Sequence, residues 1–599
     1  MTGGGHEAGE IQRTEHRGIP VFSHDGPNTY TGALVFRNGR ADETLQSGGI
    51  SHLVEHLAIH PFEALPHAIN GFVDDTRTVF HASGTPAEVA AFLNGIAANL
   101  ASLPTGRLED EMRVLRVEAH NSRLPNPAWA LRFGPRTYGL VGYPEFGLHW
   151  LGADEVTRWA AERMTASNAA LWFTGDPPEE LDLGALSEGT RMPPPVPEPV
   201  GALDLPAWIA SSDGGVSLSS VVERSTAAVS ATGIFVEALQ NELRRGLGLS
   251  YAAGSSYWRL TKGQAHVLAG ADTAPEHGAT VADAFFRVLD DLCENGPAEE
   301  VLDRYKALSR RYADHPDATV MRLDSRAADE LAGHPTLSSE ELAAETEALT
   351  VAAIAEQLRS FAEDAIYMLP PGVSAPTTRA SRLQAGPGHP PVSGNGHKVR
   401  GGVITFGAEG ITHDDGTDPR TIHWDECALA TLEGKTGISF YDVWGDSIWI
   451  GFGSDRFRRT VTESAMRALP DERRLEIDLE AAERYDQVMN AAADQLGHRE
   501  GRPLVLLPRV MFDGEQLQAL GVGDLGSNGG LIAVTDRRLL MIDDDASKLL
   551  VELARTELES AAVKKSMLRS KLVVEARGQQ FEIALARSRQ GPIGEALSS

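Results

Sequence analysis

The stretch of sequence that most constrains this chain is SGGISHLVEHLAI, residues 47–59. On a helix, positions i and i+4 share a face, so His52 and His56 could bind one metal ion. Glu55 precedes the second histidine and faces the same cleft, where it could take a proton from a water that zinc activates. The Gly48-Gly49 turn before them is typical of a helix start. The sequence therefore predicts a helix that carries a metal centre.

A second segment supplies carboxylates for that centre. A catalytic zinc needs three protein ligands and an open position for water. The stretch LEDEMRVLRVEAHNSRLPNP, residues 108–127, has helical periodicity and holds Glu111 and Glu118 seven residues apart, two turns along one face. One of them could bind zinc while the other supports it through hydrogen bonds. The alternative, two histidines satisfied by carbonyl groups on an ordinary amphipathic helix, is disfavoured by this glutamate pair.

The composition is that of an ordinary globular protein with an acidic balance. The 599 residues are 42% hydrophobic and 23% charged, which excludes a wholly disordered chain. The formal charge of −30 argues against nucleic-acid binding, which needs clustered Lys and Arg, and against stable membrane attachment. The two cysteines, Cys293 and Cys427, form no CxxC motif, so we expect no disulfide framework and no thiolate zinc site.

The chain also lacks targeting signals that can be read from the sequence. No run approaches the roughly 18 apolar residues that a membrane-spanning helix needs. The first residues, MTGGGHEAGEIQRTEHRG, do not place a basic region before an apolar one, as a secretory signal would. We therefore expect a cytoplasmic protein in a reducing compartment.

Changes in composition divide the chain into segments. The proline-rich stretch 191–206 predicts a tether, residues 370–398 predict a flexible linker, and a charged helical stretch near 470–498 marks a softer boundary. The predicted globular units are 10–190, 207–369, 399–468 and 500–592.

The first two units differ from the last two in their patterns. In the first two, strand-like runs such as GALVFRNG alternate with helical segments, which predicts an α+β fold with helices packed on one face of a sheet. In the last two, runs such as GLIAVTDRRLLMIDDD alternate apolar and polar residues, which predicts small antiparallel sheets or barrels.

The first 370 residues resemble a known enzyme family. HLVEH has the inverted order HxxEH, and NGRADETLQSGGISHLVEHLA, the Glu111/Glu118 pair, YGLVGYPEFGLHWLGADEV and NAALWFTGD are together similar to the pitrilysin/insulinase family of zinc metallopeptidases over about residues 15–370. The resemblance implies two homologous α/β sandwich domains, a catalytic one over 10–190 and a non-catalytic one over 207–369. It implies His52, His56 and Glu118 as zinc ligands, Glu55 as the catalytic base and Glu111 as a supporting carboxylate at the catalytic centre.

The second of these units resembles the family's non-catalytic domain. LRRGLGLSYAAGSSY is similar to the family segment in which an arginine and a tyrosine seven residues apart reach the partner domain's cleft, so the resemblance implies that Arg244 and Tyr251 bind substrate. Four such domains form the family's clamshell chamber. This chain has two, which implies a homodimer or a heterodimer with a related peptidase subunit.

The last two units resemble bacterial pleckstrin-homology-like (PH-like) domains. GLIAVTDRRLLMI and RTELESAAVKKSMLRSKLVVEA carry the resemblance in 500–592, and GGVITFGAEGITHDDG carries it in 399–468. The resemblance implies two small β-barrel domains that bind partners or lipid surfaces and carry no catalytic residues. The acidic overall charge favours a protein partner or self-interaction over a membrane.

These features together predict a zinc-dependent endopeptidase. It would cleave peptides or small unfolded segments inside a dimeric chamber, with water activated by zinc and Glu55. The alternative is a catalytically silent subunit with a peptidase fold, acting as a scaffold or regulatory partner through its PH-like domains. The intact HxxEH motif favours the enzyme.

Overall fold

A computed structural model of the chain divides it into two compact units. The first holds Met1–Leu108, Pro125–Gly388 and Val443–Asp446, and the second holds Glu109–Leu124, His389–Asp442 and Ser447–Ser599. The predicted domain boundaries stay predictions. The structure describes residues 11–26, 29–62, 68–121, 127–201, 203–210, 215–247, 252–313, 315–383, 386–399, 402–416, 419–433, 437–451, 455–477, 488, 491–492, 495–496, 503–504, 507, 510–512, 515–525, 528–543, 549–565, 570–576, 579–585 and 591–598.

The first sheet of the first unit has the strand order β1-β2-β6-β3-β5-β4, which leaves β4 at an edge. Strands β2 and β6 are parallel, and the other neighbours are antiparallel. The helices α1, α2 and α5 pack together on this sheet. The bounds are β1 Gln12–His16, β2 Ile19–Ser23, β3 Tyr30–Phe36, α1 Ile50–Ile59, β4 Ala68–Val73, β5 Thr78–Gly84, α2 Pro86–Ala101, α4 Pro127–Phe133, α5 Ala153–Arg163 and β6 Ala169–Phe173.

The second sheet of this unit repeats the topology of five strands of the first, but its outer strand β12 pairs parallel with β7, whereas β1 pairs antiparallel with β2. Its order is β12-β7-β11-β8-β10-β9, with β7 parallel to β11 and the next three pairs antiparallel. The edge strand β9 therefore corresponds to β4, and α6, which follows β8, corresponds to α1. The bounds are β7 Ala207–Ala210, β8 Gly215–Glu223, α6 Thr226–Asn241, β9 Ala253–Arg259, β10 Gln264–Asp272, α7 Gly278–Asn295, α8 Glu299–Ala313, α9 Pro316–Ala332, α10 Ser339–Glu347, α11 Val351–Glu363, β11 Ile366–Leu369 and β12 Ser381–Arg382.

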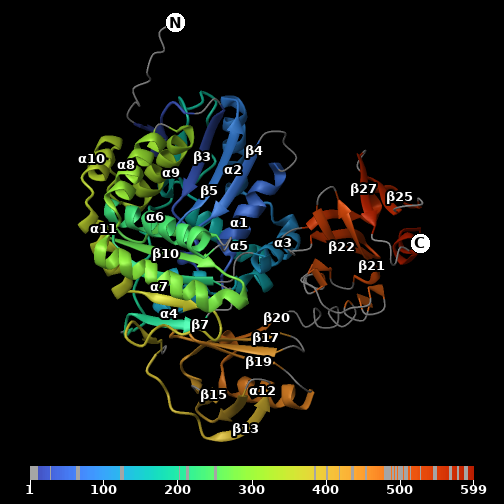
Figure 1. The fold of residues 1–599 in the computed structure, drawn as a ribbon. Coiled ribbons are helices and arrows are strands. Elements are labelled where there is room, and N and C mark those ends of the chain that lie inside the picture. The colour runs from blue at the N-terminus through green and yellow to red at the C-terminus, as the bar shows by residue number, and fades with distance from the viewer. Residues whose placement is uncertain are drawn as a thin grey trace. The chain divides into compact units, whose positions relative to one another are not determined.

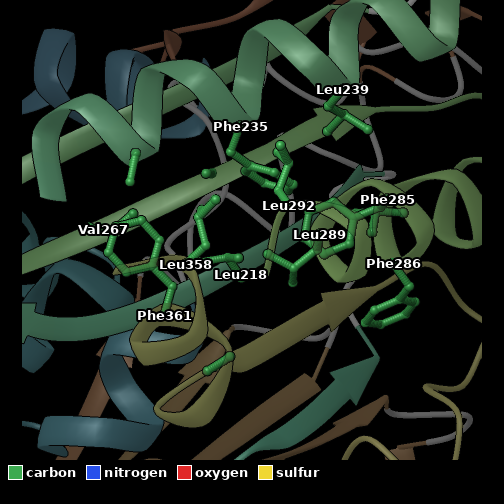
Figure 2. Packing of buried hydrophobic residues seen from close by; sticks show 14 of the residues in the cluster. Leu218, Phe235, Leu239, Val267, Phe285, Phe286, Leu289, Leu292, Leu358 and Phe361 are labelled. Carbon is green, nitrogen blue, oxygen red and sulfur yellow. The ribbon is translucent and has the colours of Figure 1, made fainter. Parts of the chain in front are cut away.

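The second sheet has its own apolar core (Figure 2). Helices α6, α7 and α11 supply Phe235, Phe285 and Leu358, which pack with Leu218 of β8 and Val267 of β10, and all five are fully buried. Phe235 and Phe285 meet edge to face with ring centroids 5.3 Å apart. Burial of this many large side chains is the main force that holds the half together.

Each half of the unit covers one face of the other half's sheet. Leu323 and Leu331 of α9 pack against Val35 and Trp172 on the first sheet. Conversely, α4 packs on the second sheet, where Ala128 lies in a cluster with Ile366 and Met368. The expectation of helices on only one face of each sheet was therefore wrong, because side chains on both faces of the strands are apolar and both must be covered.

Residues 389–477 of the second unit form two four-stranded sheets with the orders β13-β14-β15-β16 and β19-β18-β17-β20. Ile404 and Ile411 of the first and Phe440 and Ile448 of the second share a core with Val461. The bounds are β13 Gly394–Val399, β14 Gly402–Gly407, β15 Gly410–Asp414, β16 Arg420–His423, β17 Cys427–Glu433, β18 Gly437–Asp442, β19 Ser447–Gly451, α12 Asp455–Ala468 and β20 Arg474–Ile477.

The C-terminal segment forms one seven-stranded sheet with the order β24-β23-β22-β21-β27-β26-β25. Its edges β24 and β25 do not pair with each other within the described residues. The predicted closed barrels were therefore wrong, whereas the PH-like assignment stays a prediction. The bounds are β21 Leu517–Leu525, β22 Asn528–Thr535, β23 Arg538–Asp543, β24 Leu549–Ala554, β25 Leu558–Lys565, β26 Ser570–Ala576, β27 Gln579–Leu585 and α15 Gly591–Ser598.

Two further findings concern predicted segments. In the predicted linker 370–398, Ser381–Arg382 pairs with β7 and Gly394–Val399 pairs with β14, because both short strands find an edge that accepts their backbone hydrogen bonds. No helix among the described residues is both long and apolar enough to cross a membrane. Figure 1 shows the course of the chain through these elements.

Candidate metal centre

Helix α1 begins in an unusual way, with a buried glutamate in place of a side-chain cap. Gly49, at the N-cap, has a left-handed backbone (φ 92°) and no side chain that could accept a hydrogen bond. The Glu43 carboxylate accepts instead from the backbone N–H of Gly49 at 2.8 Å and of Ser51 at 2.9 Å. Burial raises the pKa of Glu43 to about 7. This contact fixes where the helix starts.

The predicted motif residues come together on α1. Within the described part of the chain, His52, Glu55 and His56 place ligand atoms within 4.8 Å of one another. Glu55 is buried, and its Oε2 lies 3.7 Å from Nε2 of His56. The two imidazole rings are nearly perpendicular, with centroids 5.0 Å apart. Two imidazoles and a carboxylate are typical zinc donors, and donor atoms about 2 Å from a tetrahedral zinc ion lie about 3.3 Å apart, so a cluster of this size fits that metal after small side-chain shifts.

The edge strand β4 passes directly beside the base. A Cβ atom added at Gly71 would lie 2.1 Å from Oε1 of Glu55 and 2.6 Å from Cδ1 of Ile59. Only glycine leaves the carboxylate its present position. Alternate residues of β4, among them Asn70 and Phe72, are exposed. Within the described residues β4 is the outer strand of its sheet, so a sheet edge adjoins the carboxylate of Glu55.

Glu145 also contacts this cluster, although no motif in the sequence points to it. Its Oε2 lies 3.4 Å from Nδ1 of His52, and its Oε1 lies 3.0 Å from Nη2 of Arg40. Burial raises the pKa of Glu145, but the hydrogen bond from His52 and the charges of Arg40, His52 and His56 outweigh burial, so its pKa lies below the usual value. The only indication of a role for Glu145 in the sequence is that it lies within YGLVGYPEFGLHWLGADEV, a segment that carries the family resemblance without singling out one residue.

Two other predicted site residues, Glu111 and Glu118, lie on a separate helix, α3, Leu108–Asn121. The residues of α3 from Glu109 onward belong to the second unit. Glu111 is buried and Glu118 is exposed. In that unit, the ring of Phe512 lies between two guanidinium groups, 3.8 Å from that of Arg113 on α3 and 3.4 Å from that of Arg538. The roles of both glutamates stay predictions.

The predicted substrate-binding pair is described in part. Arg244 is exposed on a single π-helical turn, Glu242–Gly246, that follows α6. Tyr251 lies outside the described residues. Their role also stays a prediction.

The family comparison concerns the second sheet and not α1. Residues 216–309 match the family model of the Peptidase M16 inactive domain. This stretch runs from β8 into α8 and supports a pitrilysin-type fold. It does not include His52–His56, and the corresponding helix α6 holds no histidine or cysteine. The description "inactive" therefore applies to the half that lacks the motif.

Solved structures are similar over about three fifths of the chain's length. They include a peptidase M16 inactive domain from Pseudomonas fluorescens (TM-score 0.47, 15% identity, 61% of this chain and 100% of that one). A protease from Helicobacter pylori gives a TM-score of 0.48, 15% identity and coverage of 60% and 99%. A chain of complex III2 from Candida albicans gives a TM-score of 0.47 and 14% identity, and the match covers 60% of this chain and 95% of that one. No curated protein matches the sequence.

Proposed function

We propose that this chain is a zinc-dependent endopeptidase. The observation that carries the proposal is the cluster of His52, Glu55 and His56 on α1, with a buried carboxylate beside β4, the outer strand of the sheet as far as the described residues show. This combination supports hydrolysis because it places a metal-binding pair and a base where an extended peptide can dock. Glu118, by resemblance, supplies the third ligand, and Glu111 supports it.

The chain's own residues have distinct tasks in this proposal. The bound zinc ion would supply a Lewis acid that polarises water and the scissile carbonyl. His52 and His56 hold the ion on one face of α1. Glu55 takes the proton of the attacking water and then passes it to the leaving amine. Glu55 is largely shielded from solvent, with 6% of its side chain exposed, and its Oε2 lies 3.7 Å from Nε2 of His56, so the base adjoins a proposed zinc ligand.

The edge strand β4 is the proposed substrate platform. An extended peptide can add a strand to an exposed sheet edge through main-chain hydrogen bonds, which gives affinity with little dependence on sequence. Such a peptide on β4 would pass Gly71 and therefore Glu55. The preferred substrates are accordingly extended peptides or small unfolded segments.

The remaining parts of the proposal follow from the resemblance. Arg244 and Tyr251 would bind the substrate carbonyl and the developing oxyanion. A homodimer, or a heterodimer with a related peptidase subunit, would complete a four-domain chamber in the cytoplasm. The PH-like segments would bind a protein partner and not a nucleic acid or a membrane.

The test compares wild type with Glu55→Gln for bound zinc and for cleavage of quenched fluorescent peptides. We expect about one zinc per chain in both proteins and hydrolysis in wild type, reduced at least about 100-fold in the variant, because general-base catalysis contributes roughly 100- to 10,000-fold. Glu162→Gln, which removes an exposed acid from α5, is the control and should behave as wild type.

Two results would contradict the proposal. A chain that binds no zinc would favour the silent scaffold or regulatory subunit, in which the peptidase fold serves only to bind partners. Equal hydrolysis by wild type and Glu55→Gln would show that the peptidase activity does not originate at α1.

A further inference from the structure

We infer that Glu145 is a positioning residue of the proposed zinc site, where its carboxylate holds the His52 ring at Nδ1 and so directs Nε2 to the metal. The inference rests on the proposed function and extends it to a residue 93 positions away from His52 in the sequence.

The contacts place Glu145 beside the donor cluster and not in it. Its carboxylate lies 3.4 Å from Nδ1 of His52, yet Glu145 is not part of the described group whose ligand atoms lie within 4.8 Å of one another. Its side chain is 10% exposed, and its other oxygen faces the Arg40 guanidinium at 3.0 Å. A buried carboxylate is therefore shared between a fixed cation and the imidazole of a proposed ligand.

The chain is built to bring this carboxylate close to the start of α1. The loop after Tyr143 docks on the Gly48-Gly49 turn, where the backbone N–H of Gly147 donates to the carbonyl oxygen of Gly48 at 2.9 Å. A Cβ atom at Gly49 would lie 2.9 Å from Cβ of Glu145. The glycine that permits the helix start thus also permits the approach of Glu145.

The chemistry follows from the single N–H of a neutral imidazole. A carboxylate at Nδ1 holds that hydrogen there, so the lone pair that can bind a metal lies on Nε2. The same hydrogen bond restricts rotation of the ring and raises its basicity as a ligand. Arg40 holds the carboxylate in its ionised form and in place. Without Glu145 the ring can adopt the other tautomer and other rotamers, which weakens binding of the metal.

The test measures zinc affinity by chelator competition in wild type, Glu145→Ala, Glu145→Gln, His56→Ala and the exposed control Glu162→Gln. We expect Glu145→Ala to keep one zinc site but to bind it about 10- to 100-fold more weakly, the usual effect of removing such a partner. Glu145→Gln should lie between that variant and wild type, because its amide oxygen can still accept the Nδ1 hydrogen. The cobalt(II)-substituted Glu145→Ala protein should show shifted visible bands, since the His52 ring is reoriented.

Each other outcome overturns the inference in a recognisable way. Affinity within twofold of wild type in Glu145→Ala would exclude a positioning role. Complete loss of the metal, as in His56→Ala, would make Glu145 a direct ligand. Absence of zinc from wild type would contradict the proposed function itself, and the inference with it. Apoprotein melting temperatures separate these results from misfolding of a variant.

Discussion

At the scale of single residues, the closest constraint on the proposed centre is the approach of β4 to Glu55. The edge strand can lie against α1 only because position 71 has no side chain. A methyl group there would overlap the carboxylate at 2.1 Å, a separation that real Cβ atoms do not adopt. Either the strand or Glu55 must therefore move, and a displacement of about 1 Å can cost 100-fold in rate.

We therefore predict that Gly71→Ala lowers kcat/KM for peptide hydrolysis at least about 10-fold while zinc content stays at the wild-type value. Gly254→Ala is the matched control, because Gly254 lies on the corresponding edge strand β9 and a Cβ atom there meets nothing within 4 Å. Unchanged activity in Gly71→Ala would mean that the substrate and Glu55 do not depend on this approach.

The α1 residues could be predicted from the sequence, but Glu145 could not. His52, Glu55 and His56 are brought together by helical geometry alone, which a spacing of three and four residues specifies. Glu145 reaches His52 because an irregular loop docks on a glycine turn, and no local periodicity encodes that contact. The same reason leaves Glu118 a prediction, since its contribution depends on how segments far apart in sequence meet.

At the scale of elements, the start of α1 depends on a buried carboxyl group. Glu43 accepts from two backbone N–H groups that the glycine N-cap cannot satisfy. Burial raises its pKa to about 7, above the ordinary value near 4.5. The folded protein therefore holds a proton at Glu43 that the unfolded chain releases between about pH 4.5 and 7, so the stabilisation by this proton is lost as the pH rises through that interval.

We predict that Glu43→Gln, which cannot titrate, removes this pH dependence. The raised pKa of Glu43 corresponds to about 3 kcal/mol of folding free energy that wild type loses as the pH rises and the variant does not. The melting temperature of the variant minus that of wild type should therefore rise by several degrees between pH 5 and pH 8. Thermal unfolding at several pH values checks this. The exposed Glu162→Gln control should keep a constant offset, and a constant offset in Glu43→Gln as well would mean that Glu43 does not carry the dependence.

Individual elements were predictable where their patterns were local. The run GALVFRNG contains most of β3, and GLIAVTDRRLLMIDDD contains most of β22 and all of β23, because a short apolar run bounded by polar and glycine residues suffices to indicate a strand. Closure of the sheet was not predictable. It would require β24 to pair with β25, and such a pairing depends on the twist and shear of the whole sheet and not on either sequence.

At the scale of the whole molecule, the first unit consists of two halves that share the topology of five strands and cover each other. Helix α9 of the second half supplies a face of the core of the first sheet, and α4 of the first half does the same for the second sheet. The halves are therefore linked by core packing, and loss of that packing should destabilise both.

We predict that Leu323→Ala, in the buried face of α9, lowers the free energy of unfolding of the first unit by about 2 to 5 kcal/mol. Met321→Ala is the control, because this residue lies on the same helix and is 59% exposed. Thermal unfolding of the full chain checks the effect, and limited proteolysis shows whether cleavage within residues 11–201 becomes faster. Equal melting temperatures for the two variants would mean that α9 does not form part of the core of the first sheet.

Because each half supplies a helix that covers the other half's sheet, the order of synthesis also sets the order in which the two halves can finish folding on the ribosome. The N-terminal half is synthesised first, yet one face of its sheet stays uncovered until Ala332 at the end of α9 has emerged. A chain stalled before that point would present Val35 and Trp172 to water, and it would be a target for chaperones. The half with the metal motif is therefore finished only after most of its motif-free counterpart has been made.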